Sequence, residues 1–174
     1  MEMLNNILLV TIPSLIVFLT SFFLLRNMIK NDQQKRKQEI ILQSGRIITP
    51  IRLQAYERLV LFLERISLES LIVRVHNTGM SATQLHSALL STIRSEYEHN
   101  LSQQIYISQQ AWEVVKNARS NMVKLINTEF EKLPSNANGL EFSRQLLGTI
   151  MELDKEPTKA AVEFIKNEAA RLIM

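Results

Sequence analysis

The stretch ILLVTIPSLIVFLTSFFLL, from Ile7 to Leu25, decides which architectures the rest of the chain can adopt. It holds nineteen residues without a charge, and as an α-helix it would rise about 28 Å at roughly 1.5 Å per residue, close to the ~30 Å hydrocarbon thickness of a bilayer. Fourteen of these residues are Leu, Ile, Val or Phe, which contribute about −4 to −8 kcal/mol on an insertion scale. A soluble core helix of this length would show a charge where it met water. The run therefore predicts a transmembrane helix.

The two flanks of the run predict an uncleaved anchor and its orientation. Glu2 is the only charged side chain before the run, and no small-residue cleavage signal follows Leu25. Basic residues close to a span stay in the cytoplasm and can contact anionic lipid headgroups. Five such residues follow the run within twelve positions: Arg26, Lys30, Lys35, Arg36 and Lys37. We expect a short outer tail and anchor over residues 1–25, a basic juxtamembrane segment over 26–46 and a cytoplasmic domain over 47–174.

Small polar residues inside the run predict a second transmembrane helix beside it. Thr11, Ser14 and Ser21 share one helical face, whereas Thr20 lies opposite. Such residues let two helices approach closely and form hydrogen bonds between them. The alternative is that each hydroxyl is satisfied by the backbone of its own helix. We favour transmembrane packing through Thr11, Ser14 and Ser21.

The charge of the chain is unevenly distributed. The sequence has a net charge of +3 and a pI near 9.3. Residues 47–174, however, hold fourteen Lys and Arg against fourteen Asp and Glu. The basic character belongs to the segment after the run, so nucleic acid is a disfavoured partner for the domain. The absence of cysteine excludes disulfides, cysteine-ligated zinc and thiol nucleophiles.

The part of the chain after the run is predicted to be an all-α domain. Gly45 and the pair Thr49-Pro50 predict the end of a basic juxtamembrane helix and the start of a new one. Apolar residues then recur at helical spacing. We predict five helices, which begin near Pro50, Ser81, Ser108, Asn138 and Pro157. The segments Ser70–His76 and Gln104–Ser108 alternate in polarity, so a short two-stranded element remains an open alternative.

Candidate chemistry in the sequence is sparse. Glu96 and His99 have the Glu-x-x-His spacing of carboxylate metal bundles, but those bundles need a second copy, and neither His76 nor His86 supplies it. No nucleophile elbow, phosphate loop or dinucleotide fingerprint is present. We therefore expect no enzyme activity and no cofactor. A metalloenzyme built on glutamates and His99 is the least favoured hypothesis.

The segment EYEHNLSQQIYISQQAW, from Glu96 to Trp112, is rich in amides and hydroxyls. Tyr97, Tyr106 and Trp112 within it are candidate anchors of a partner surface, since aromatic residues are enriched in interface cores. The alternative is a set of core aromatic residues flanked by a polar loop.

A family resemblance is carried by this segment and by ITPIRLQAYERLVLFLERIS, from Ile48 to Ser67. With its apolar run, the chain resembles an uncharacterised family of small membrane-anchored proteins from the Bacteroidota. The resemblance implies a bacterial inner-membrane location and brings no activity, cofactor or catalytic residue.

The sequence supports three hypotheses about function. The first is a non-catalytic accessory or scaffold subunit of an inner-membrane complex, which docks another membrane protein through its span and its helical domain. The alternative is a membrane-tethered binder of ribosomes or nucleic acid through the basic segment, and the third is the metalloenzyme. Formation of homo-oligomers is compatible with all three.

Overall fold

A computed structural model describes residues 2–152 and 156–172. Inside its first helix, the side chains of residues 2, 4–8, 10–12, 14, 41 and 44 lie outside the description. The contacts divide the chain into two units, Met1–Ile48 and Thr49–Met174, called unit 1 and unit 2 below. Each is described by itself.

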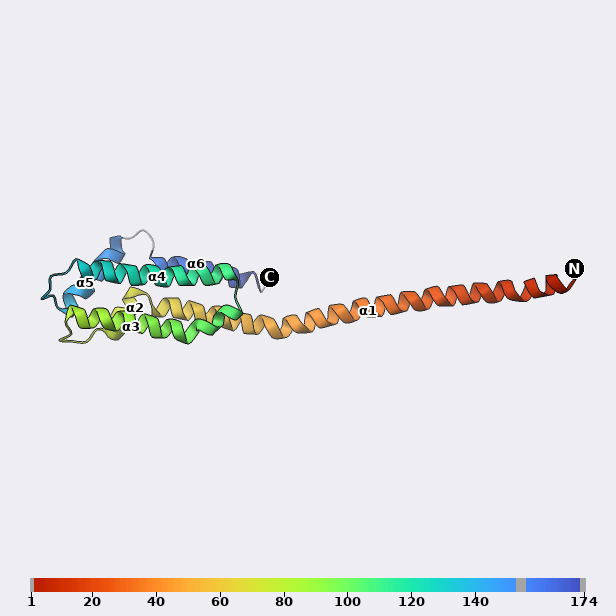
Figure 1. Ribbon diagram of the computed structural model, residues 1–174, viewed down its shortest axis with the longest axis horizontal. Coiled ribbons are helices and arrows are strands. Elements are labelled where there is room, and N and C mark those ends of the chain that lie inside the picture. Colours follow the sequence, from red (N-terminus) through yellow and green to blue (C-terminus); the bar gives the residue numbers. More distant parts are fainter. Residues whose placement is uncertain (1, 153–155, 173–174) are drawn as a thin grey trace. The chain divides into compact units, whose positions relative to one another are not determined.

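The described residues form helices and the turns between them (Figure 1). Helix α1 (Glu2–Arg65) makes up unit 1 and contributes its last turns to unit 2. Unit 2 continues with α2 (Leu68–Val75), α3 (Ala82–Asn100), a short 3₁₀ helix η1 (Leu101–Ile105), α4 (Gln109–Glu131), α5 (Gly139–Glu152) and α6 (Pro157–Ala170). The all-α prediction is confirmed for this part of the chain.

The two-stranded alternative is wrong. Ser70–His76 lies mostly in α2, whose residues Leu68, Leu71 and Ile72 are buried at helical spacing while Val73 is 80% exposed. The segment Gln104–Ser108 spans the end of η1 and the turn before α4. A short alternating segment forms a strand only where another strand can pair with its backbone. Here these segments pack against neighbouring helices instead and form no strand.

The helix boundary predicted at Gly45 and Thr49-Pro50 is also wrong, because α1 continues through all three residues to Arg65. The φ of proline is compatible with a helix. Pro50 lacks an amide hydrogen, so the helix loses only the backbone hydrogen bond to the carbonyl oxygen of Arg46, four residues earlier. Arg46 is exposed, so water can reach this stretch of backbone. The helix predicted from Pro50 is therefore the final part of α1, and α2 and η1 are additional elements.

The other predicted helix starts are confirmed. Ser81 and Gln84 form a reciprocal capping box at α3, in which the Ser81 hydroxyl accepts from the backbone amide of Gln84 at 3.2 Å. Asn138 and Glu141 make the same pair of bonds at α5, at 2.9 and 3.1 Å. The Ser108 hydroxyl accepts from the Ala111 amide at 3.0 Å, and α6 begins with Pro157. Each cap satisfies amide groups that the first helical turn leaves free.

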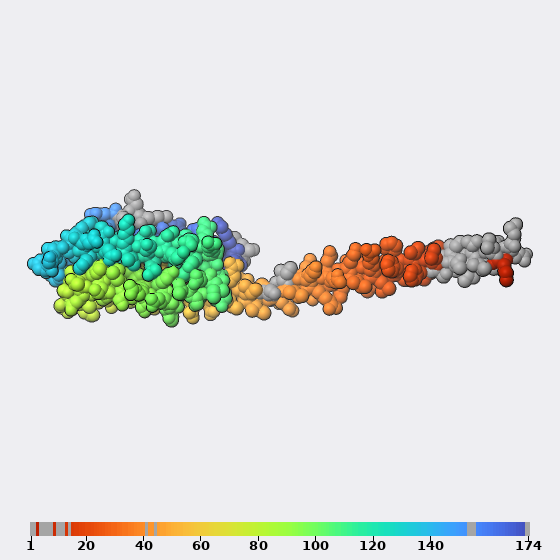
Figure 2. Space-filling model, in the orientation of Figure 1, coloured from red at the N-terminus to blue at the C-terminus, as the bar shows by residue number. Residues whose placement is uncertain are grey.

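One apolar core holds unit 2 together. In Figure 1, α4 lies beside α6 and α3, and α3 also packs against α5. Figure 2 shows the side chains of α3 and α4 meeting along the visible face of this unit. The predicted apolar stripes supply the core, which includes Tyr56, Leu59, Phe62, Leu63, Leu85, Leu89, Ile93, Val115, Met122, Ile126, Phe142, Leu146 and Ile165.

The start of α5 contains a close backbone approach at Gly139. Its amide donates to the Met80 carbonyl oxygen at 2.8 Å, next to an isolated antiparallel bridge between Ser81 and Asn138. A Cβ atom added at Gly139 would lie 2.9 Å from that same oxygen, whereas one added at Gly148 would meet nothing within 4 Å. Only glycine fits the first position, and the second tolerates a side chain.

We expect alanine at these two glycines to change stability in opposite directions. Gly139→Ala should lower the free energy of unfolding by roughly 1–3 kcal/mol, because the backbone oxygen of Met80 must move. Gly148→Ala should raise it by about 0.5–1 kcal/mol through the better helix propensity of alanine. Urea denaturation followed by the fluorescence of the single tryptophan measures both. Equal effects of the two substitutions would contradict the close approach at Gly139.

Candidate interaction sites

The described side chains of the apolar run are exposed on every side of α1. Nine large apolar residues from Leu15 to Leu25 have exposed fractions from 45% at Leu19 to 66% at Phe18; they are Leu15, Ile16, Val17, Phe18, Leu19, Phe22, Phe23, Leu24 and Leu25. Within the part of the chain that the structure describes, no helix combines the length and the hydropathy that crossing a membrane requires. The exposed residues nevertheless form an apolar sleeve around one stretch of helix. We call these nine residues the α1 sleeve.

The three residues predicted to pack against another span are only partly described. The side chains of Thr11 and Ser14 lie outside the described residues, and Ser21 is exposed on α1. Thr20, on the opposite face, donates to the carbonyl oxygens of Ile16 and Val17, each at 2.9 Å. Its hydroxyl is therefore satisfied by its own helix.

The basic segment is a solvated part of α1. Its six basic residues, Arg26, Lys30, Lys35, Arg36, Lys37 and Arg46, are all exposed. The Arg36 guanidinium lies 3.1 Å from the Asp32 carboxylate one turn earlier, and the two side chains are 75% and 62% exposed. Such an exposed pair contributes at most about 1 kcal/mol. The segment remains available to headgroups or other anions.

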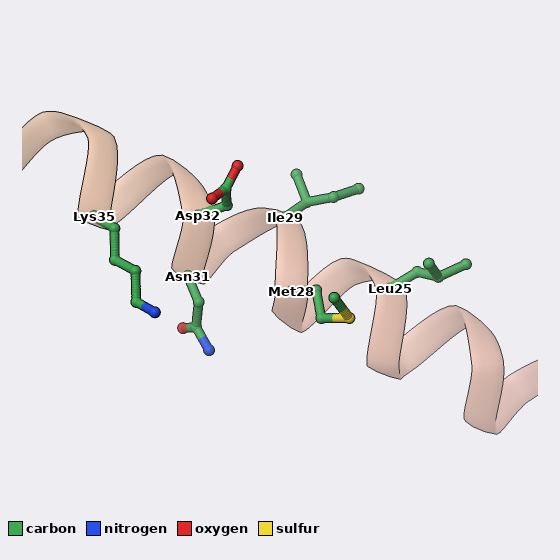
Figure 3. A pocket seen from close by; sticks show the side chains of 6 residues that line it. All are labelled: Leu25, Met28, Ile29, Asn31, Asp32 and Lys35. Carbon is green, nitrogen blue, oxygen red and sulfur yellow. The ribbon is translucent and has the colours of Figure 1, made fainter.

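A shallow depression lies where the sleeve meets the basic segment (Figure 3). All of its lining residues come from successive turns of α1, so no second element encloses it. Leu25, Ile29 and Asp32 project to one side of the helix, and Asn31 and Lys35 project to the other. The depression is part of a helix surface and has no walls that would surround a small ligand.

The three candidate aromatic anchors differ in how far their side chains are exposed. The rings of Tyr97 and Trp112 stack at 5.6 Å, and Phe62 lies 6.1 Å from Tyr97. Trp112 is 8% exposed, and the Arg119 guanidinium covers the Tyr97 ring at 4.2 Å. Tyr106, in contrast, is 41% exposed. Of the three, Tyr106 is the one whose ring is open to a partner.

Tyr106 has apolar neighbours that the sequence reasoning missed. Leu101 and Ile105 in η1 are 42% and 74% exposed. The Tyr106 carbonyl oxygen accepts from the Arg52 side chain of α1 at 3.0 Å, which fixes the end of η1 to the first helix of unit 2. We call Leu101, Ile105 and Tyr106 the η1 patch. Large apolar residues in a stretch without charges, from Asn100 to Trp112, were the sequence signal that could have identified it.

Near this end of unit 2, a buried tyrosine joins α1 to α6. The Tyr56 hydroxyl donates to the Glu168 carboxylate at 2.5 Å, and the Tyr56 residue is 1% exposed. Burial, followed by the neighbouring Glu168 carboxylate, raises the pKa of Tyr56 above its usual value. Tyr56 therefore stays protonated at neutral pH and acts as a hydrogen-bond donor between two helices.

The Glu96-x-x-His99 pair is divided between two environments. The Glu96 carboxylate pairs with Arg65 at 2.7 Å and with Arg74 at 3.2 Å, whereas His99 is exposed. Among the described residues, no group of three His, Cys, Asp or Glu side chains is placed to hold a metal ion. Glu96 joins α1, α2 and α3 as an ion-pair centre.

Glu129 is a buried carboxylate between α4 and α5. It is 4% exposed, and its carboxylate accepts from Lys132 at 2.6 Å and from the Gln145 amide at 2.9 Å. Burial acts to raise the pKa of Glu129, but the hydrogen bonds from Lys132 and Gln145 outweigh it, and the pKa lies below its usual value near 4.5. The site holds a charged carboxylate at neutral pH and is structural.

We expect Glu129→Gln to destabilise unit 2 in a pH-dependent way. A lowered pKa in the folded state adds stability that is fully present above the ordinary value near 4.5 and is lost as the pH falls through the folded value. At pH 7 the variant should lose roughly 1–3 kcal/mol, and the difference from wild type should shrink in acid. Urea titrations at neutral and acid pH measure this, with the exposed neighbour Glu131→Gln as control. A difference that stayed constant with pH would contradict the charged state of Glu129.

No curated protein and no solved structure matches this chain. The expectation of an uncharacterised family is confirmed, because the model of the "Family of unknown function (DUF7935)" matches residues 2–172, and this chain belongs to that family.

Proposed function

We propose that this protein is a non-catalytic accessory or scaffold subunit of a bacterial inner-membrane complex. Its apolar run anchors it in the membrane with the short N-terminal tail outside, and its helical domain lies in the cytoplasm and docks a protein of the same complex through the η1 patch. The observation that carries the proposal is the α1 sleeve, with nine large apolar side chains at least 45% exposed around one helix.

The α1 sleeve supports membrane insertion on physical grounds. A helix that is apolar on every side is stable where it is surrounded by protein or lipid, since each exposed Å² of apolar surface costs about 25 cal/mol in water. An isolated helix has little stability of its own in water, so propensity does not compensate for this exposure. The uncharged stretch extends from Leu25 back to Ile7, which gives the length that a bilayer requires.

The η1 patch supports docking of a protein. Its three residues are large and apolar, and no charged residue lies between Asn100 and Trp112. Desolvating such a surface costs little, and aromatic residues such as Tyr106 serve as binding anchors. The hydrogen bond from Arg52 holds the backbone carbonyl of Tyr106 before a partner arrives, so less backbone conformational entropy is lost on binding.

Affinity purification after brief crosslinking in cells tests this function. Membranes are solubilised gently, and co-purified proteins are quantified by mass spectrometry. We expect one membrane complex at fixed stoichiometry, which is lost from the double variant Ile105→Ala with Tyr106→Ala. The double variant Leu61→Ala with Val73→Ala, which truncates exposed apolar residues elsewhere on unit 2, should retain it.

Two results would contradict the proposal. Recovery of the protein without any partner would contradict a role as a subunit of a complex. An equal yield of partner from both double variants would contradict docking through the η1 patch.

A second candidate function is a membrane-tethered binder of ribosomes or nucleic acid. The observation in its favour is the exposure of the basic side chains between Arg26 and Lys37. Binding through phosphates would fall steeply with salt, and replacing Lys35, Arg36 and Lys37 by glutamine should abolish it. Binding that survived these substitutions would exclude this candidate.

A further inference from the structure

A stripe of large apolar residues runs along one side of α1 within unit 1. Successive members are three, four, seven or eleven positions apart, and each of these spacings is close to a whole number of turns at roughly 3.6 residues per turn. All members are between 51% and 66% exposed. They are Leu15, Phe18, Phe22, Leu25, Ile29, Ile40 and Ile47, and we call them the α1 stripe.

The geometry of the α1 stripe is that of a seam between helices. The rings of Phe18 and Phe22 stack at 6.4 Å, and Leu25 and Ile29 project to the same side of the helix in Figure 3. From Leu15 to Ile29 the members alternate three and four positions apart, which is the seven-residue spacing of a left-handed coiled-coil seam. The step of eleven positions from Ile29 to Ile40 departs from this repeat and corresponds to about three turns of a straight helix.

On the basis of the function proposed above, lipid covers only part of the α1 stripe. If the apolar run spans the bilayer, acyl chains cover the stripe from Leu15 to Leu25. Ile40 and Ile47 follow the cluster of basic residues that ends at Lys37, on the cytoplasmic side, where lipid does not reach. They are 62% and 66% exposed, and they need a protein partner that continues out of the membrane.

We propose that the α1 stripe pairs in parallel with the α1 stripe of a second copy of this chain. The partner must run beside α1 from the membrane into the cytoplasm and present apolar side chains at the same heights. A second copy does both, because two chains anchored in one membrane point the same way. In a parallel pair, each stripe residue faces its own counterpart.

Polar residues interrupt the α1 stripe, and Gln33 among them favours such a pair. A side-chain amide both donates and accepts, so two glutamines can bond to each other and fix the register. Arg36 disfavours the pair, because it would face a second Arg36, and the Asp32 carboxylate at 3.1 Å offsets only part of this repulsion. Confinement of both copies to one membrane raises their effective concentration for each other.

The absence of cysteine from the chain allows a sharp test. Single cysteines are introduced into the full-length protein at Ile40 or Ile47 on the α1 stripe. Leu42→Cys is the matched control, since Leu42 is 66% exposed and faces the opposite side of the helix from Ile40. Isolated membranes are oxidised with copper phenanthroline, which links cysteines whose Cα atoms approach within about 7 Å.

The expected result is a disulfide-linked dimer from Ile40→Cys and Ile47→Cys, several-fold more abundant than from Leu42→Cys. If the protein is in the membrane fraction, equal dimer yields from all three positions would overturn the pairing, and so would the absence of any dimer. Neither result would contradict the anchor. Labelling the Ile40→Cys variant with a photoreactive maleimide reports any other neighbour of this position. A crosslink to a different protein would also overturn the pairing. Recovery of the variants in the soluble fraction would instead contradict the proposed anchor, and crosslinking in that fraction would still decide the pairing.

Discussion

Replacing Ile16 and Val17 together by lysine should move this protein from the membrane fraction to the soluble fraction. Both residues lie near the middle of the uncharged run and are 56% and 63% exposed on α1. A lysine at the centre of a span costs about 2.5–3.5 kcal/mol on an insertion scale, so two cost roughly 5–7 kcal/mol. This penalty is comparable to the total of about 4–8 kcal/mol that the apolar residues of the run contribute. Extraction of membranes with alkaline carbonate, followed by immunoblotting, measures the change.

The matched control adds the same charge outside the run. Gln34→Lys with Gln38→Lys places two lysines in the basic segment, on exposed positions away from the α1 stripe. This variant should stay in the membrane fraction and resist carbonate. Wild-type protein that was released by carbonate, or a double lysine variant that remained inserted, would contradict the anchor.

Trp112→Ala should cause the largest loss of stability of any single substitution named here. Trp112 is 8% exposed and stacks on Tyr97, which also contacts Phe62 and lies under the Arg119 guanidinium. Removing a buried indole typically costs about 3–5 kcal/mol, because the cavity that it leaves is only partly refilled. Urea denaturation followed by helical circular dichroism measures the loss, since the variant has no tryptophan to report it.

Tyr106→Ala is the control for this substitution and separates stability from binding. Tyr106 is 41% exposed, so its truncation should change the free energy of unfolding by no more than about 0.5 kcal/mol. The same variant should weaken capture of the partner complex. A large loss of stability from Tyr106→Ala would show that this ring supports the fold and that the η1 patch is not a free surface.

Local signals in the sequence predicted several helix starts of unit 2 correctly. Ser81 with Gln84, Asn138 with Glu141, and Ser108 work as caps because each hydrogen bond joins atoms only three residues apart. Gly45 and Pro50 were misread because a helix breaker lowers local stability without forbidding a helix. Whether the helix continues depends on the stability of its two flanks.

The candidate sites were less predictable. Tyr97, Tyr106 and Trp112 look alike in the sequence, since all three lie within a polar stretch. The structure distinguishes them, because Phe62 and Arg119 come from other helices to cover Tyr97. The same holds for Glu96, whose partners Arg65 and Arg74 belong to α1 and α2.

The sequence by itself determined the all-α class, the helix caps and the uncharged apolar run, because each depends on atoms or periodicities within a few turns of chain. Only the tertiary structure decided that Leu68–Val75 is a helix, that Gly139 meets a backbone oxygen, and that Tyr106 stays exposed while Trp112 is buried. These features depend on contacts between residues far apart in the sequence. Such contacts are set by how the helices pack, and a local pattern does not specify which distant residue each side chain meets.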